Sequence, residues 1–177
     1  MVAGEVIPIP WSLYPRYVFE PTVTLAIIFD VSGSLDKGLI SMLVNDLNNV
    51  LREIKPAEIW VFHSDSEVRF VKQYKYPHTD AIEPPRNVPE PGKRKSSAIT
   101  PPFRYMAEHN INVKNILYFT DLHPTAKTPE EIEKSLPGLI TQIGARKVLW
   151  LVPSYIKVLD NYWKPNIGKI IWVEPLI

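Results

Sequence analysis

A nearly continuous apolar run, VTLAIIF at residues 23–29, is followed after a short turn by a helical pattern, and this succession constrains the fold more than any other feature. A strand that is apolar at every position has both faces covered, which is typical of a parallel sheet between layers of helices. From Asp36 to about Lys55, apolar residues recur every three or four positions, and Pro56 ends the pattern. Together the two segments predict the first β-α unit of an α/β domain.

The same alternation continues along the chain. Further strands are predicted at 58–62, 67–72, 115–120, 147–152 and 169–173, and further helices after Thr100 and at 128–144. A turn-forming Ser64-Asp65-Ser66 separates the first two of these strands, so they are expected to form a hairpin-like antiparallel pair. The complete pattern predicts a Rossmann-like, three-layer α/β/α sandwich with a mostly parallel central sheet and one antiparallel edge strand.

Chain length and proline content indicate the domain organisation. The 177 residues suffice for one well-buried domain, which we place at residues 22–177. The 18 prolines cluster in residues 1–21 and between Pro77 and Pro102, where irregular backbone is expected. We expect residues 1–21 to pack on the domain as a proline-rich N-terminal segment. A long irregular stretch such as 76–97 is typical of a functional or mobile loop.

Composition narrows the classes of partner and site. The formal net charge of +1 provides no basic footprint for nucleic acid or an anionic membrane. The first twenty residues include Glu5, Arg16 and three prolines and lack the apolar core of a signal peptide, so a cytoplasmic location is expected. With no cysteine, disulfides, zinc-thiolate sites and thiol nucleophiles are excluded. A protein or a small ligand is therefore the expected partner.

Short oxygen-bearing side chains gather where the first strand leads into the helix. Alternation places Asp30, Ser32 and Ser34 on one side of this turn. Asp121 ends a second buried strand, and α/β sheets bind ligands beyond the carboxyl ends of their strands. Carboxylate and hydroxyl ligands suit Mg²⁺, Mn²⁺ or Ca²⁺ rather than zinc or copper. The alternative is a helix-capping turn in which Ser34 or Asp36 accepts hydrogen bonds from free amides.

The Asp-x-Ser-x-Ser pattern of residues 30–34 resembles the metal-ion-dependent adhesion site of von Willebrand factor type A (VWA) domains. The YFTD segment, residues 118–121, is similar to the third loop of that site, and the resemblance covers roughly residues 22–177 by order of elements. It implies that Asp121 joins Asp30, Ser32 and Ser34 around a divalent ion. It also implies that a protein partner offers an Asp or Glu as the last ligand.

The second loop of the family supplies a hydroxyl and usually reads Gly-Gly-Thr, whereas this chain has Lys-Ser-Ser at residues 95–97, followed by Ala-Ile-Thr at residues 98–100. Two alignments are possible, with either Ser97 or Thr100 as the hydroxyl ligand. We favour Ser97, because Thr100 is expected to act as the N-cap of the helix that begins at Pro101.

Bacterial and phage VWA-like proteins, in which this domain follows a metallopeptidase-like region, resemble the chain most, and VFHSDSEV at 61–68 and VLWLV at 148–152 add to the likeness. No His-Glu-x-x-His motif occurs, so peptide hydrolysis is not implied and a non-catalytic protein is expected. Relatives of this kind often work beside AAA+ ATPases of the MoxR type, which suggests a partner class.

Several alternative interpretations stay open. In the first alternative, the domain is a VWA scaffold without metal, because Lys-Ser-Ser replaces the Gly-Gly-Thr of the family. In another, Asp30 is the nucleophile of a Mg²⁺-dependent phosphatase, although the second Asp that such enzymes need is Ser32 here. The sequence Asp121-Leu122-His123 also resembles the start of a metallophosphoesterase, whose later motifs are missing. Asp65 is predicted to form a structural Asx-turn.

Overall fold

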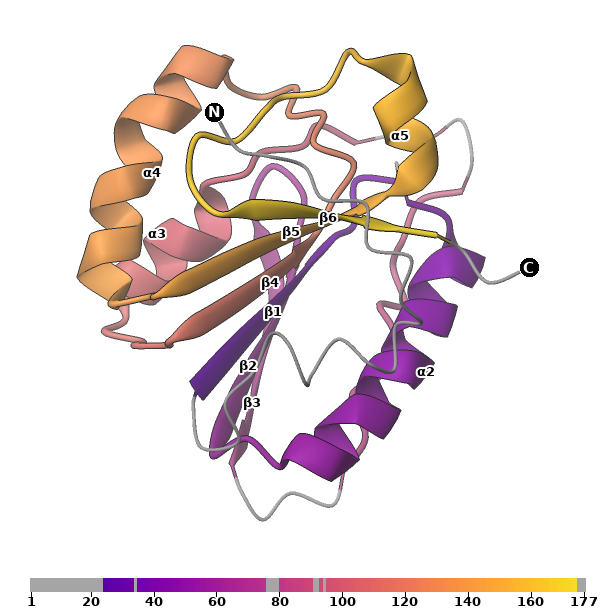
Figure 1. Ribbon diagram of the computed structural model, residues 1–177, viewed down its shortest axis with the longest axis vertical. Coiled ribbons are helices and arrows are strands. Elements are labelled where there is room, and N and C mark those ends of the chain that lie inside the picture. Colours follow the sequence, from indigo (N-terminus) through magenta and orange to yellow (C-terminus); the bar gives the residue numbers. More distant parts are fainter. Residues whose placement is uncertain (1–23, 34, 76–79, 91–92, 94, 175–177) are drawn as a thin grey trace.

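The computed structural model describes residues 24–174 except 34, 76–79, 91–92 and 94. The predicted N-terminal segment 1–21 lies outside the described residues. Figure 1 shows the elements, whose bounds are β1 Thr24–Asp30, α2 Lys37–Ile54, β2 Glu58–Ser64, β3 Val68–Lys75, α3 Pro101–Glu108, β4 Asn115–Phe119, α4 Pro129–Ile143, β5 Lys147–Pro153, α5 Ser154–Leu159 and β6 Lys169–Val173. Among the described residues, no helix has the length and apolar character needed to cross a membrane.

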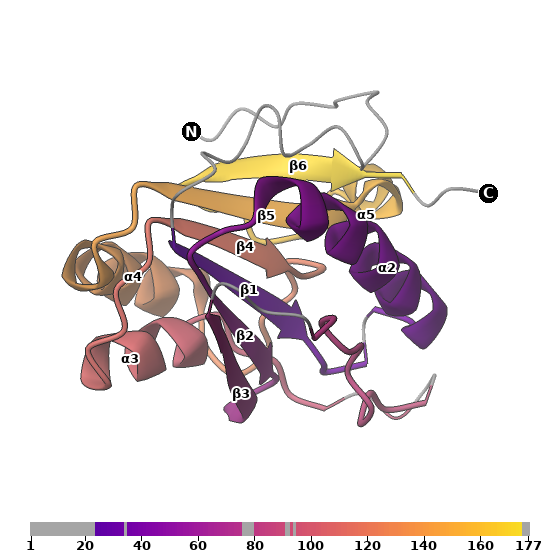
Figure 2. The same ribbon diagram turned by 90° about the horizontal axis from the view of Figure 1, so that it is seen from below.

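The described strands form a single sheet with the order β3-β2-β1-β4-β5-β6. Neighbouring strands pair in parallel except β2 and β3, which are antiparallel. Helix α2 covers one face of the sheet, and α3 and α4 cover the other (Figure 2). The predicted α/β architecture, with a mostly parallel sheet and an antiparallel edge strand, is therefore confirmed.

Strand β1 is buried on both faces, as its apolar run predicts. Leu25, Ile27 and Phe29 belong to the core cluster that packs with α2. Ala26 and Ile28 belong to the cluster that packs with α3 and α4. This double burial fixes the strand in the middle of the sheet and leaves Asp30, its last residue, at the carboxyl edge.

Local signals account for the ends of two helices. The Asp36 side chain accepts a hydrogen bond from the Leu39 amide (3.0 Å) and so caps α2. Thr128 and Glu131 form the predicted capping box of α4, with both reciprocal hydrogen bonds present. Gly144 ends α4 in the left-handed conformation, with φ at 80°.

The structure corrects the sequence-based account of α3 and α5. Helix α3 begins at Pro101 as predicted, but the Thr100 side chain makes no capping hydrogen bond. An N-cap side chain reaches the free amides from an extended backbone, whereas Thr100 is helical (φ −77°, ψ −22°). Thr100 thus occupies the predicted N-cap position, but the expected side-chain cap is absent. Helix α5 was not predicted, because six residues are too few for helical periodicity to be recognised.

Candidate metal centre

The sheet brings the carboxyl ends of β1 and β4 together. The two strands pair in parallel, with Phe29 opposite Phe119. The chain runs from β1 outward to β2 and β3 and then returns to β4 on the other side of β1, so this edge is a topological switch point. Asp30 and Asp121, the two carboxylates at these strand ends, are only 2% and 1% exposed.

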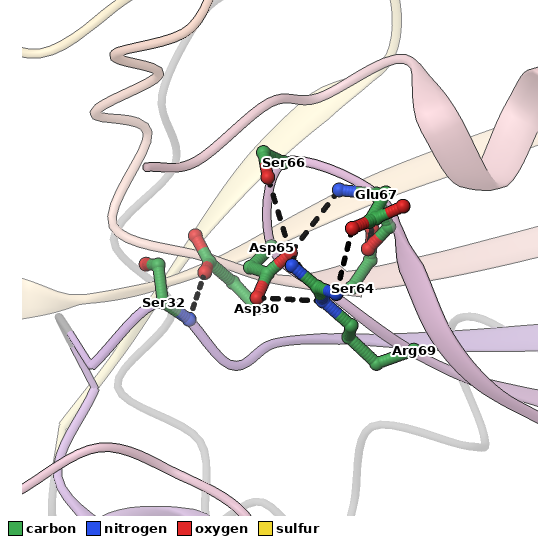
Figure 3. Close-up of polar contacts among 7 residues, drawn as sticks. All are labelled: Asp30, Ser32, Ser64, Asp65, Ser66, Glu67 and Arg69. Atoms are coloured by element: carbon green, nitrogen blue, oxygen red, sulfur yellow. Dashed lines mark hydrogen bonds and ion pairs between the residues drawn. The ribbon is translucent and has the colours of Figure 1, made fainter. Parts of the chain in front are cut away.

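Asp30 accepts hydrogen bonds from three segments of the chain. Its Oδ1 accepts from the backbone amide of Ser32 (2.9 Å), and Ser32 also contributes a side-chain hydrogen bond. Its Oδ2 accepts from the hydroxyl groups of Ser97 (3.1 Å) and Thr120 (3.3 Å). Figure 3 shows the Asp30 carboxylate beside the Ser32 amide. Oxygen atoms from three separate loops therefore converge on one buried carboxylate.

Within the described part of the chain, no hydrogen bond or ion pair joins a cationic side chain to the carboxylate of Asp30. Its hydrogen-bond partners among the described residues are amide and hydroxyl groups. Burial raises the pKa of Asp30 to about 6, and the neighbouring charge of Asp121 adds to this, while the hydrogen bonds from Ser32 and Ser97 partly oppose it. Two buried carboxylates with hydroxyl neighbours are the donor set that suits a hard divalent cation.

In the metal-free protein, the free energy of unfolding is expected to fall as the pH rises from about 4 to about 6. The folded protein keeps the proton on Asp30 up to about pH 6, whereas the unfolded chain releases it near 3.8. The folded state thus binds more protons in this window, and the difference between a pKa of about 6 and one of 3.8 corresponds to a loss of at most about 3 kcal/mol.

Urea unfolding in the presence of a chelator, repeated across this pH range, measures the effect. The Asp30→Asn variant lacks the titrating group and is the control that isolates its contribution. A pH dependence that is equally steep in the variant would contradict the assignment to Asp30.

The structure distinguishes the two candidates in the second loop by position. Ser97 is buried and donates its hydroxyl group to Asp30. Thr100 is also buried, but it lies at the start of α3 and is not among the hydrogen-bond partners of Asp30. The structure thus brings Ser97, and not Thr100, to the carboxylate of Asp30, and Thr100 takes the N-cap position of α3 without a side-chain hydrogen bond.

Backbone hydrogen bonds tie the second loop to its neighbours. The Lys95 amide donates to the Ser32 carbonyl (2.8 Å), and the Ala98 amide donates to the Asp65 carbonyl (2.9 Å). The Ser97 carbonyl accepts from the amides of Thr125 and Ala126, both at 2.9 Å. The hydroxyl-bearing loop is therefore joined to three other segments around the site.

The first loop turns sharply after Ser32. Gly33 has a φ of 97°, a backbone conformation that favours glycine, so it allows the chain to turn closely at this point. The Val31 amide donates to the Ser64 carbonyl (2.9 Å), which holds the loop against the end of β2. Ser34, the third predicted ligand of this loop, lies outside the described residues.

Thr120 is a residue of this cluster that the sequence analysis missed. It is fully buried, donates to Asp30 and accepts from the Leu122 amide (3.0 Å). The position of Thr120 beside Asp30 could be predicted by pairing the apolar runs of β1 and β4 as parallel strands. With Phe29 opposite Phe119, the next residues along the two strands are Asp30 and Thr120.

The turn after β4 orients the carboxylate of Asp121. Its Oδ1 accepts from the His123 amide (3.0 Å), and its Oδ2 lies 4.0 Å from the Nδ1 of His123. Leu122, between them, is buried with a φ of 57°, which is uncommon for a side chain without a polar group. A strained turn thus holds the second carboxylate close enough to Asp30 for their charges to repel.

Asp65, the remaining buried carboxylate of this region, has a different environment. Its Oδ1 accepts from the Glu67 amide (3.1 Å), which confirms the predicted Asx-turn. The Nε of Arg69 lies 2.9 and 3.0 Å from its two oxygens (Figure 3). Its charge is therefore compensated by an arginine, whereas the partners of Asp30 that the structure describes are amide and hydroxyl groups.

The donor set is dominated by hydroxyl groups rather than by acidic or imidazole side chains. Within the described part of the chain, no three or more His, Cys, Asp or Glu side chains are grouped so that they could hold a metal ion. A cation at this centre would depend on the carboxylates of Asp30 and Asp121 together with the hydroxyl groups beside them.

A scan against models of protein families finds no match to this chain, and a search of curated proteins finds no significantly similar sequence.

Proposed function

We propose that the protein is a metal-dependent protein-interaction module of the VWA type. Asp30, Ser32, Ser97 and Asp121 hold Mg²⁺ or Mn²⁺, some of them through water, and Ser34 joins the set by its resemblance to the family pattern. The bound ion supplies a coordination position that attracts a carboxylate. An Asp or Glu of a protein partner occupies this position, and an AAA+ ATPase of the MoxR type is the partner class that the resemblance suggests.

One observation carries the proposal. Asp30 is buried beside a second carboxylate, and its partners among the described residues are amides and hydroxyl groups. A buried negative charge without a compensating positive group is costly unless a cation neutralises it. The three loops lie at this edge of the sheet and hold their oxygen atoms in place, and they shield Asp30 from water. Because the ligands are already gathered, binding an ion requires less loss of conformational entropy.

A scaffold without metal is the second candidate, and the same hydrogen bonds support it. The hydroxyl groups of Ser97 and Thr120 and the amide of Ser32 satisfy the oxygens of Asp30 without an ion. With its pKa near 6, Asp30 is also partly protonated close to neutral pH. The two candidates therefore predict different results when cations are added. A metal site predicts that the folded protein becomes more stable, and a scaffold without metal predicts no change.

Titration of the chelator-treated protein with Mg²⁺ and Mn²⁺ tests the proposal. Metal that binds only the folded state should raise the free energy of unfolding by about 2.7 kcal/mol at 100-fold excess over Kd, seen as a melting shift together with calorimetric heat. Asp121→Asn should weaken both responses. Absence of heat and of a melting shift at millimolar metal would favour the scaffold, and partner binding that is indifferent to chelator would refute the proposed function.

A further inference from the structure

A pocket of about 570 Å³ opens beside the candidate metal centre. Its walls come from β2, β3, the loop at residues 83–87 and Lys95. The loop lies on the α2 side of the sheet, where the side chain of Asn48 in α2 hydrogen-bonds to both backbone groups of Ile82 (2.8 Å each). A concave site of this volume is in the range that holds a ligand or a few side chains of a partner.

The pocket and the metal centre share one loop. Val31 lines the pocket, whereas its neighbours Asp30 and Ser32 contribute to the centre. Lys95 also lines the pocket, and its amide donates to the Ser32 carbonyl (2.8 Å). Since adjacent residues are about 3.8 Å apart, an extended segment bound at the centre needs only a few residues to reach the pocket.

The lining of the pocket carries an excess of positive charge. Four basic and two acidic side chains line it: Arg69, Lys72, Arg86, Lys95, Asp65 and Glu83. Ion pairs join Arg69 to Asp65 (2.9 Å) and Arg86 to Glu83 (2.6 Å). No ion pair joins Lys72 or Lys95 to an acidic residue among those described. These two ammonium groups therefore remain available to an anionic partner.

An aromatic surface lies next to these charges. The ring of Phe70 is stacked on that of His63 at 4.4 Å between centroids, yet Phe70 is 42% exposed. The Lys72 ammonium lies 4.7 Å from the centre of the Tyr74 ring. Burial lowers the pKa of His63 to about 4, so its imidazole is neutral at neutral pH. The pocket thus combines an exposed aromatic wall with ammonium groups.

We propose that this pocket is a second recognition subsite for an acidic segment of the protein partner. An apolar or aromatic side chain of that segment packs against Phe70, and a flanking carboxylate pairs with Lys72 or Lys95. The inference rests on the proposed function, because the same segment places its metal-binding Asp or Glu at the neighbouring centre. Charge complementarity selects an acidic segment, and the aromatic wall selects the residue beside the acid.

A random heptapeptide library displayed on phage and panned on the full chain with Mg²⁺ supplies the probes. Acidic peptides that carry an aromatic or large apolar residue should be enriched. Binding of the selected peptides, measured by fluorescence anisotropy, should weaken at least about tenfold in Lys72→Glu, because the new carboxylate repels the peptide. Lys134→Glu, a charge reversal on exposed α4 across the sheet, is the matched control and should change binding less than about twofold.

The outcomes separate this inference from the proposed function. Peptides that need Mg²⁺ but bind Lys72→Glu as well as the unaltered protein would overturn the subsite and leave the metal-dependent function standing. Peptides that need Lys72 but bind equally well in chelator would support the pocket and overturn the metal-dependent function. Recovery of no acidic peptide in the presence of Mg²⁺ would overturn both.

Discussion

Asp30→Asn is expected to weaken Mg²⁺ binding at the proposed site strongly and, at neutral pH, to make the metal-free protein more stable. In the proposed site the substitution removes a charged ligand, and losing one should cost more than the 10- to 100-fold typical of outer-shell groups, so the Mg²⁺ affinity should fall by at least about 100-fold. It also removes a buried charge whose pKa is raised to about 6 by desolvation. Relief of that cost should raise the free energy of unfolding by about 1–3 kcal/mol.

The packing around residue 30 supports a stable variant. The Asn carbonyl oxygen can still accept from the Ser32 amide, and the hydroxyl groups of Ser97 and Thr120 can turn to accept from its amide group. Calorimetric titration and urea unfolding in chelator measure the two effects separately. A variant that keeps its Mg²⁺ affinity within about tenfold of the original would remove Asp30 from the ligand set.

Asp36→Asn is the matched control for this substitution. Asp36 is exposed and caps α2 through its Oδ1, and Asn caps a helix about as well as Asp. This variant makes the same chemical change six residues away from Asp30. Both the Mg²⁺ affinity and the stability should therefore stay close to those of the original protein.

Gly168→Ala is expected to cause the largest loss of stability, on the order of 3–5 kcal/mol. Gly168 has a φ of 82°, which an alanine adopts only with strain. A methyl group at this position would lie 2.5 Å from the Val148 carbonyl oxygen and 2.9 Å from the Nε1 of Trp150. That indole nitrogen already donates to the Ile167 carbonyl (2.8 Å), so β5 or the start of β6 would have to shift.

Gly138→Ala provides the control for a glycine in open space. Nothing lies within 4 Å of the position that its methyl group would occupy, and the residue is inside α4. Alanine in a helix interior should stabilise the protein by about 0.5–1 kcal/mol. Urea unfolding of both variants should give effects of opposite sign, and a loss below about 1 kcal/mol in Gly168→Ala would contradict the steric account.

The architecture was predictable because its signals are local. The apolar run of β1 and the helical period of α2 each occur within one continuous segment, and burial on both faces implies a parallel sheet. The antiparallel pair of β2 and β3 followed from the turn at Asp65. Helix α5 and the uncapped start of α3 could not be predicted, because tertiary packing and backbone conformation decide them rather than sequence pattern.

The candidate site was predictable only in part, for a related reason. Asp30 and Ser32 are two residues apart, and Asp121 ends a recognisable strand, so parallel pairing alone implies their proximity. The contact of Ser97 with Asp30 joins residues 67 positions apart, and no local pattern specifies it. The raised pKa of Asp30 depends on its burial, which only the assembled fold provides.

The loop that carries Ser97 is held largely by main-chain atoms, with a further hydrogen bond from the Ser97 amide to the Thr125 hydroxyl group (2.9 Å). Its bonds to Ser32, Asp65, Thr125 and Ala126 use carbonyl and amide groups that every residue except proline possesses in full. Mutations of the exposed Ser96 to other non-proline residues would therefore leave these links intact, whereas Ala98 is 3% exposed and leaves little room for a larger side chain. The exposed side chain at position 96 can therefore vary while the hydroxyl group of Ser97 keeps its position.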